Sequence, residues 1–108
     1  MPTPTPAAIL SFIDTTNAED TDGFLASFTA DASIDDGGRT FHGVEGIADW
    51  NESDNIGKHS RFDVVEIAEG TSADEFVVTM DVTGDGYNGI GTMTFVVDGD
   101  LVRSLVIT

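Results

Sequence analysis

The sequence predicts an α+β fold, with three N-terminal helices packed on a curved, mostly antiparallel sheet. Three observations support this prediction. Apolar residues recur at helical spacing in the first half of the chain, and four segments rich in Val, Ile, Thr and Phe follow Gly57. Short turn sequences separate those four segments. Because parallel neighbours need a crossover of a dozen or more residues, the short separators favour antiparallel pairing.

Three helices are expected from the spacing of apolar residues and from capping signals. The first is predicted over about 7–16, the second over 23–28 with Asp20 or Thr21 as its N-cap, and the third from Gly43. Their expected inner faces consist of Ile9, Phe12, Ile13 and Thr16, then Phe24, Leu25 and Phe28, then Val44, Ile47, Ala48 and Trp50.

A short hairpin is predicted between the second and third helices. A Gly-Gly pair at 37–38 separates two strands, 32–36 and 39–42, and suits a two-residue turn that needs positive φ. This turn fixes the register of the two strands and places Asp36 opposite Arg39.

Asp36 is the unexpected residue of this hairpin. Side chains alternate across a strand, so Asp36 shares a face with Ile34, Arg39 and Phe41, and that face is the apolar one. A carboxylate there is either paired with Arg39 across the turn or used inside a pocket. The sequence leaves both interpretations open.

The four C-terminal strands are predicted at about 59–69, 74–83, 88–98 and 101–108. One face of the third strand carries Gly89, Gly91, Met93, Phe95 and Val97. Its two glycines either leave space beside the sheet or let the strand bend sharply. The apolar side chains that follow them suit a ligand wall or an ordinary core.

Several local motifs occur together along the chain: Asn17-Ala18 after the first helix, GFLASF at 23–28, ADASI at 30–34 and GVEGI at 43–47. In this combination the chain resembles the nuclear transport factor 2-like superfamily, which includes the SnoaL-like polyketide cyclases and the ketosteroid isomerases. The resemblance implies a single cone-shaped domain over 7–108 after a flexible leader at 1–6. It also implies where a pocket should lie, though not what enters it, and a homodimer formed through the sheet. The apolar residues expected inside the cone either hold a hydrophobic small molecule or simply fill the space.

The resemblance places Asp36 at the position of the general base of the ketosteroid isomerases. The positions of that family's two oxyanion donors correspond to Phe12 and Gly91, whose side chains have no hydrogen bond to donate. Loss of one such donor typically costs about 10²–10³ in rate, so ketosteroid isomerisation by that arrangement is not expected. Two hypotheses remain: a lyase, isomerase or cyclase that uses Asp36 on a hydrophobic carbonyl compound, and a non-catalytic ligand-binding or dimerisation module.

The candidate site follows from these arguments. Asp36 is the candidate catalytic residue, with Arg39, His59 and Asp81 as possible accessory polar residues. His59, at the start of a strand, is better explained as an exposed histidine, and the orientation of Asp81 depends on the sheet register. The expected pocket wall consists of Phe12, Phe28, Phe41, Trp50, Met93 and Phe95.

Charge excludes several classes of partner. The net charge is −16, from 20 acidic residues against four Lys and Arg. This field repels phosphate backbones and anionic membrane surfaces, so nucleic-acid and membrane binding are not expected. The acidic residues are spread along the chain and only one lysine occurs, which is typical of proteins from a salt-rich cytoplasm; an acidic mesophilic protein is the alternative.

We expect neither a metal nor a cofactor. The chain has no cysteine and two histidines, and the calcium-loop-like segment that starts at Asp81 has Thr92 at its twelfth position, where an acid is needed. No apolar run reaches about 18 residues, and the N-terminus lacks the basic start of a secretory signal, so a cytoplasmic protein is expected.

Overall fold

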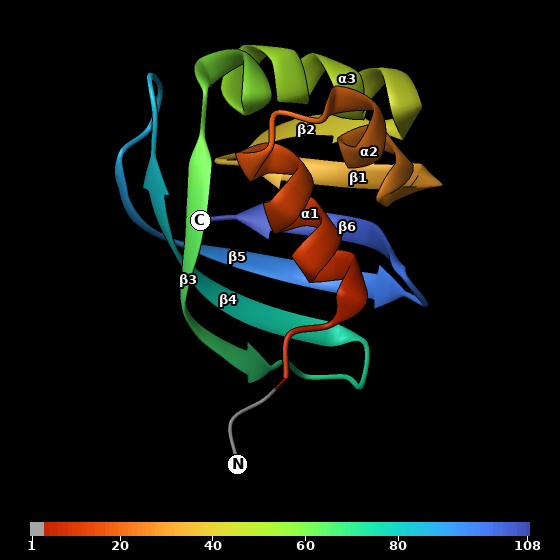
Figure 1. Ribbon diagram of the computed structural model, residues 1–108. Coiled ribbons are helices and arrows are strands. Elements are labelled where there is room, and N and C mark those ends of the chain that lie inside the picture. Colours follow the sequence, from red (N-terminus) through yellow and green to blue (C-terminus); the bar gives the residue numbers. More distant parts are fainter. Residues whose placement is uncertain (1–3) are drawn as a thin grey trace.

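The computed structural model describes residues 4–108 and confirms the α+β prediction (Figure 1). Residues 1–3 of the expected leader lie outside the described residues. The helices are α1 (Ala7–Asn17), α2 (Thr21–Ala26) and α3 (Gly43–Asp54), followed by the short 3₁₀ helix η1 (Ile56–Lys58). The strands are β1 (Phe28–Asp36), β2 (Arg39–His42), β3 (Arg61–Glu69), β4 (Glu75–Thr83), β5 (Gly89–Asp98) and β6 (Leu101–Ile107).

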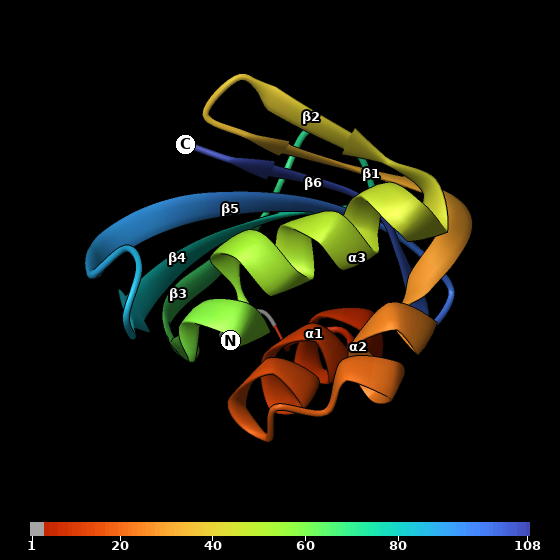
Figure 2. The ribbon, with the colours of Figure 1, turned by 90° about the horizontal axis from the view of Figure 1, so that it is seen from above.

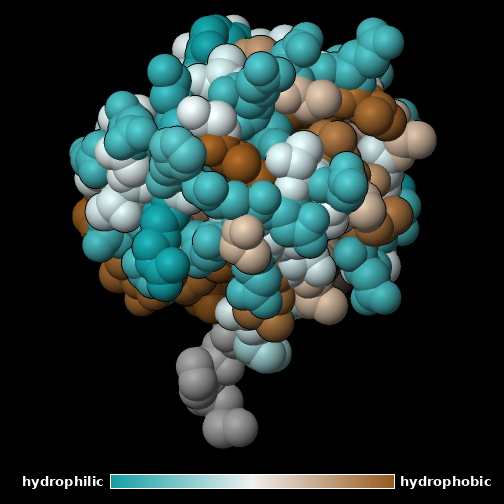
Figure 3. Space-filling view, turned by 45° about the horizontal axis from the view of Figure 1, so that its top comes forward, coloured by the Kyte–Doolittle hydropathy of each residue, from teal (hydrophilic) through white to brown (hydrophobic). Residues whose placement is uncertain are grey.

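The six strands form one curved sheet in the order β2-β1-β6-β5-β4-β3. Figure 2 shows the helices on the concave side of this sheet, which gives the cone shape. The last four strands pair antiparallel with one another, as the short separators predict. β1 and β6 pair in parallel, which joins the hairpin to the meander. Viewed with the top of Figure 1 brought forward, hydrophilic residues are spread over the whole visible face, with hydrophobic residues between them (Figure 3).

The predicted hairpin register is confirmed. Asp36 pairs with Arg39 and Ile34 pairs with Phe41, while Gly37 and Gly38 both have positive φ. The left-handed region is accessible to glycine without steric cost, so this pair allows the tight turn. The turn therefore holds Asp36 at the end of β1.

The second helix is shorter than predicted, and β1 starts earlier. Asp20 caps α2 as expected by accepting a hydrogen bond from the Gly23 backbone N–H. The helix ends at Ala26, because the Ser27 carbonyl accepts a hydrogen bond from the Val102 N–H and the chain then joins β6. Phe28 is consequently the first residue of β1 rather than part of the helix, although it is buried as predicted.

Two details of the third helix and of β3 also differ from the prediction. Val44 is 57% exposed, because the buried face of α3 runs through Ile47, Trp50 and Asn51. β3 begins at Arg61 rather than at His59, since η1 precedes it and His59 has a left-handed φ of 53°.

Phe12 is the centre of the core. Its side chain is fully buried, and its ring contacts five aromatic rings at centroid distances between 5.1 and 6.4 Å, those of Phe24, Phe28, Trp50, Phe62 and Phe95. The contacts join α1, α2, α3 and three strands of the sheet. This aromatic cluster lies between the helices and the sheet and belongs to the hydrophobic core.

Candidate ligand pocket

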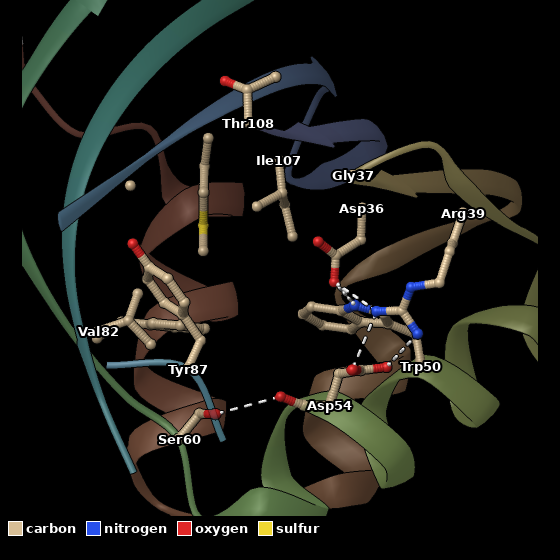
Figure 4. Close-up of a pocket in the computed structure, with 13 residues that line it drawn as sticks. Asp36, Gly37, Arg39, Trp50, Asp54, Ser60, Val82, Tyr87, Ile107 and Thr108 are labelled. Carbon is tan, nitrogen blue, oxygen red and sulfur yellow. Dashed lines mark hydrogen bonds and ion pairs between the residues drawn. The ribbon is translucent and has the colours of Figure 1, made fainter. Parts of the chain in front are cut away.

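A pocket of about 370 Å³ opens beside the aromatic core, between the β1–β2 hairpin, the C-terminal end of α3 and the sheet (Figure 4). Its size lies at the lower end of the range of small-molecule sites, about 300–1,000 Å³. The wall is mixed, with apolar side chains over the sheet and charged groups next to the hairpin. The lining residues are Asp36, Gly37, Arg39, Trp50, Asp54, Ser60, Phe62, Val82, Tyr87, Gly91, Met93, Ile107 and Thr108.

The sheet register explains why Asp36 reaches this pocket. Asp36 pairs with Ile107 in the parallel β1–β6 ladder, and Ile107 pairs with Met93 in the antiparallel β6–β5 ladder. The three residues therefore form a row across three strands, and all three line the pocket. Paired residues of adjacent strands point to the same face of a sheet, so the parallel pairing brings the hairpin carboxylate alongside the apolar wall.

The two oxygens of Asp36 have different environments. Oδ2 accepts hydrogen bonds from Trp50 Nε1 at 3.0 Å and from Arg39 Nη2 at 3.1 Å. Oδ1 accepts none from the side chains of residues 4–108, and it points towards the side of the pocket where Ile107 lies (Figure 4). The side chain is 25% exposed. The two interpretations of Asp36 are thus not exclusive, because the carboxylate pairs with Arg39 and also lines a pocket.

Arg39 joins the hairpin to α3. It donates hydrogen bonds to both oxygens of Asp54, at 3.0 and 3.3 Å, and its guanidinium lies 5.4 Å from the centre of the Phe41 ring. Burial favours a higher pKa for Asp54, but the hydrogen bonds from Arg39 and Ser53 outweigh it, so the pKa of Asp54 is lowered. The same bond to Asp54 raises the pKa of Arg39. The rim of the pocket therefore carries two carboxylates and one guanidinium.

Comparison with known protein families identifies the family of this chain. The SnoaL-like domain family matches residues 9–104. The chain belongs to the SnoaL-like family. The predicted resemblance is therefore confirmed. A search of curated protein sequences gives no match.

Solved structures with the same fold include a protein from Sinorhizobium meliloti described as a polyketide cyclase, with a TM-score of 0.85, 23% identity, and coverage of 96% of this chain and 95% of that chain. A Mycobacterium tuberculosis protein in complex with estradiol-17β-hemisuccinate has a TM-score of 0.79 and 18% identity. The match covers 93% of this chain and 88% of that chain. The Δ5-3-ketosteroid isomerase of a Mycobacterium species has a TM-score of 0.79 and 19% identity. The match covers 94% of this chain and 89% of that chain.

The expected pocket wall of this SnoaL-like protein needs correction. Trp50 and Met93 line the pocket, but the four phenylalanines predicted with them do not. Phe12, Phe28 and Phe95 are buried in the aromatic core, since aromatic side chains gain more by packing on one another than by facing an open space. Phe41 packs on the edge of the core beneath Arg39.

Two of the three accessory polar candidates lie away from the pocket. His59 is 63% exposed, and its Nδ1 lies 2.7 Å from Oε2 of Glu19, which raises the pKa of His59. Asp81 belongs to the face of β4 opposite the buried Val78 and Met80, so it points out of the cone. Arg39 is the candidate that lines the pocket.

Several lining residues were not predicted. Asp54 follows Trp50 by four positions, so helical spacing could have placed it on the same side of α3. Tyr87 comes from the loop between β4 and β5, where its hydroxyl donates to the Ile90 carbonyl, and Ser60 comes from the segment between η1 and β3. These two connections have no periodicity to reveal which side chains turn inward.

Within residues 4–108, no group of three or more His, Asp or Glu side chains is arranged to hold a metal ion. None of the helices in this part of the chain is long and apolar enough to cross a membrane.

Proposed function

We propose that this SnoaL-like protein binds a hydrophobic carbonyl compound and that Asp36 removes a proton from the carbon next to the carbonyl group. One observation carries the proposal: a carboxylate on the wall of a mainly apolar pocket has one oxygen held by two donors and the other oxygen without such a bond among the described side chains. A base held in one orientation, with a lone pair towards the ligand, is what proton abstraction needs.

The pocket supports a ligand that is apolar with one polar end. Met93, Ile107 and Val82 offer apolar contacts, while Asp36 and Arg39 lie at the hairpin side. A protein of the same fold, from M. tuberculosis, is seen in complex with estradiol-17β-hemisuccinate, a largely hydrocarbon molecule, which supports an apolar ligand here. The carbonyl group would lie near Asp36 and the hydrocarbon part over the sheet.

The proposed reaction is a proton transfer from the ligand to Asp36, and it needs no second reactant. The C–H bond next to the carbonyl breaks, its proton moves to Oδ1 of Asp36, and the electron pair forms a carbon–carbon double bond while the carbonyl oxygen becomes an enolate oxygen. In a ketone that also has a double bond between the next two carbons, the product is a dienolate, and return of the proton from Asp36 to the far end of that double bond, which moves into conjugation with the restored carbonyl, completes an isomerisation. Trp50 and Arg39 keep the carboxylate oriented through Oδ2. Ser60 and Tyr87 carry hydroxyl groups on the pocket wall, but their hydrogens are donated to the Asp54 and Ile90 carbonyls, so either hydroxyl has to exchange that bond before it donates to the enolate oxygen.

Hydrogen–deuterium exchange tests the proposal directly. The probes are neutral cyclic ketones, and NMR in D₂O follows deuterium entering the carbon next to the carbonyl. Trp50 is the single tryptophan and lines the pocket, so its fluorescence reports binding of the same ketones. We expect Asp36→Asn to lower enzyme-dependent exchange by about 10²–10⁴-fold, the usual contribution of a general base, while binding changes little.

Asp35→Asn is the matched control, because Asp35 lies in the same hairpin and its side chain accepts a hydrogen bond from Gly38 in the turn. It should leave exchange and binding unchanged. Binding without exchange in the wild type would contradict proton abstraction and favour the alternative, a non-catalytic ligand-binding module in which the Asp36–Arg39 pair is structural.

We further propose a homodimer formed through the outer face of the sheet. Although the chain carries a net charge of −16, a strip of this face is uncharged and partly apolar. It consists of Val77, Thr79, Ile90, Thr92, Thr94, Val96 and Val106. Sedimentation equilibrium should give a dimer for the wild type and a monomer for Val106→Lys, since a charge at this exposed position would be buried between the copies. A monomeric wild type at all concentrations would contradict this proposal.

The acidic surface supports a third proposal, that the protein works in a salt-rich cytoplasm. The five ion pairs of residues 4–108 involve five acidic side chains, so most of the 20 acidic side chains have no cationic partner. Dissolved cations screen the repulsion between these carboxylates, and this screening is strong only at high salt.

A further inference from the structure

We infer that the pocket selects its ligands by charge: a hydrophobic compound with an ammonium group binds with that group at Oδ1 of Asp36, and the corresponding carboxylate is rejected. The inference uses the same orientation of Asp36 on which the proposed function rests, but it needs no proton abstraction. It therefore concerns a class of ligand that occupies the pocket without reacting and keeps a ketone away from the base.

The hydrogen bonds at the rim of the pocket leave one strong acceptor open. Both oxygens of Asp54 accept hydrogen bonds from Arg39. Oδ2 of Asp36 accepts from Arg39 and from Trp50, whereas Oδ1 accepts no hydrogen bond within residues 4–108. An ionised oxygen of this kind makes its strongest hydrogen bond with a charged donor, and an ammonium group supplies that donor.

The charges around this oxygen also favour a cation. The lining side chains include two carboxylates, those of Asp36 and Asp54, and one guanidinium, that of Arg39, which leaves one negative charge. Because Arg39 donates to both oxygens of Asp54, at 3.0 and 3.3 Å, these two charges largely offset each other and Asp36 supplies the remainder. Lys58 lowers the pKa of Asp54 from outside the pocket lining. The whole chain carries −16, so its long-range field has the same sign as the pocket.

The rest of the wall suits the hydrocarbon part of such a ligand. The apolar and aromatic lining side chains are those of Trp50, Phe62, Val82, Tyr87, Met93 and Ile107. Aromatic ring faces attract cations and carry a negative potential that disfavours anions. A cavity of about 150 Å³ holds benzene, so a pocket of about 370 Å³ has room for a compact cage of ten carbon atoms.

A carboxylate of the same shape finds no equivalent place. At Oδ1 of Asp36 it would bring two negative charges together with no proton between them, and the lost hydration of both would be left uncompensated. Arg39 is the cation of the lining, but its side chain is 55% exposed and already binds two carboxylates. An anion on its outer side would form a solvent-screened pair, which contributes little to binding.

Three adamantane derivatives test the inference, because they share one hydrocarbon cage and differ in the charge of a single substituent. They are 1-adamantylammonium, 1-adamantanol and 1-adamantanecarboxylate, used at slightly alkaline pH and one salt concentration. None of them fluoresces, so Trp50 fluorescence reports the dissociation constant of each. We expect the ammonium to bind about 10-fold more tightly than the alcohol, since it adds an opposite charge to the hydrogen bond that the alcohol also makes. The carboxylate should bind at least about 10-fold more weakly than the alcohol.

Two variants separate the effect of Asp36 from that of the net charge. Asp36→Asn should remove the preference for the ammonium over the alcohol. Asp35→Asn is the matched control, because it removes the same charge from the same hairpin, while Asp35 does not line the pocket and accepts a hydrogen bond from the Gly38 N–H in the turn. It should keep the preference. An equal loss in both variants would assign the preference to the field of the whole chain and overturn the inference.

The indole N–H of Trp50 gives a second readout at the same carboxylate, since it donates to Oδ2 of Asp36 and belongs to the single tryptophan. In ¹⁵N-labelled wild type the ammonium should shift this NMR signal more than the alcohol does. This measurement needs no variant, so it tests the inference even where Asp36→Asn fails to fold. Equal shifts would contradict binding of the charged group at Asp36.

The outcomes for the inference and for the proposed function can be told apart. Equal affinities for the ammonium and the alcohol, or no binding of either, would overturn the inference, and tightest binding of the carboxylate would make Arg39 the binding group instead. Deuterium exchange of ketones tests the proposed function separately. Exchange in a protein without preference for the ammonium leaves the proposed function standing alone, and a clear preference in a protein without exchange leaves only the inference.

Discussion

Phe12→Ala is expected to lower the free energy of unfolding by about 3–5 kcal/mol, the usual cost of emptying a buried phenylalanine site. Phe12 is fully buried, and its ring contacts five other aromatic rings that belong to α2, α3 and three strands. The surrounding elements cannot all move inward to fill the cavity, so the loss should fall in the upper part of that range. A domain with a total stability of about 5–15 kcal/mol would then be close to unfolding.

Urea denaturation followed by circular dichroism measures this loss. Phe12→Leu is the control, because it keeps most of the apolar volume and should cost clearly less than alanine. The experiment also decides between the sequence-based assignment of Phe12 to a ligand wall and its place in the core. A loss below about 1 kcal/mol for Phe12→Ala would mean that the ring faces an open space, since truncation there removes few contacts.

The second large effect is that of salt on stability. Two unit charges about 20 Å apart in water repel by about 0.2 kcal/mol without screening, and 16 excess charges form on the order of 100 such pairs. Unfolding relieves much of this repulsion, because the radius of gyration increases from 12.5 Å to about 33 Å. With partial screening at about 0.01 M salt, we estimate a destabilisation of about 5 kcal/mol that almost vanishes near 1 M, where the Debye length is about 3 Å.

The expected result is a melting temperature that rises by about 20 °C between these two salt concentrations, at about 4–8 °C per kcal/mol for a domain of this size. Calorimetry in increasing potassium chloride measures it, and the same series in sucrose shows how much comes from solute exclusion rather than from screening. A melting temperature that stays constant or falls in potassium chloride would contradict both the estimate and the proposal of a salt-rich cytoplasm.

Local signals explain why most of the fold could be predicted. The hairpin register could be predicted from Gly37-Gly38 and the residues next to them. The antiparallel pairing of the last strands could be predicted from the short segments that separate them. The end of α2 could not be predicted in the same way. Ser27 leaves the helix because its carbonyl meets the Val102 N–H, a partner at the other end of the sequence. Propensity describes neighbours along the chain and carries no information on such a pairing.

The candidate site was predictable in part for the same reason. The position of Asp36 follows from strand alternation, which is local, and so does the inward face of Met93. The choice between core and pocket is not local, because it depends on which aromatic rings from distant parts of the chain meet in the core. Phe12 and Phe95 meet there, whereas Trp50 has one side in the core and its indole N–H at the pocket. Periodicity identified all three as buried and had no means of separating them.

The parallel pairing of β1 with β6 has a consequence for how the chain folds. The β1–β2 hairpin and the β3–β6 meander each depend on contacts between strands that are close in sequence. Ile34 pairs with Leu105, however, and this contact closes a loop that contains the whole intervening chain. Closing so long a loop slows folding, and in any chain where it has not closed, β1 and β6 are open edges. Such edges recruit strands from other molecules. Mutual repulsion between acidic chains opposes that contact, and the salt that stabilises the finished protein removes this protection during its assembly.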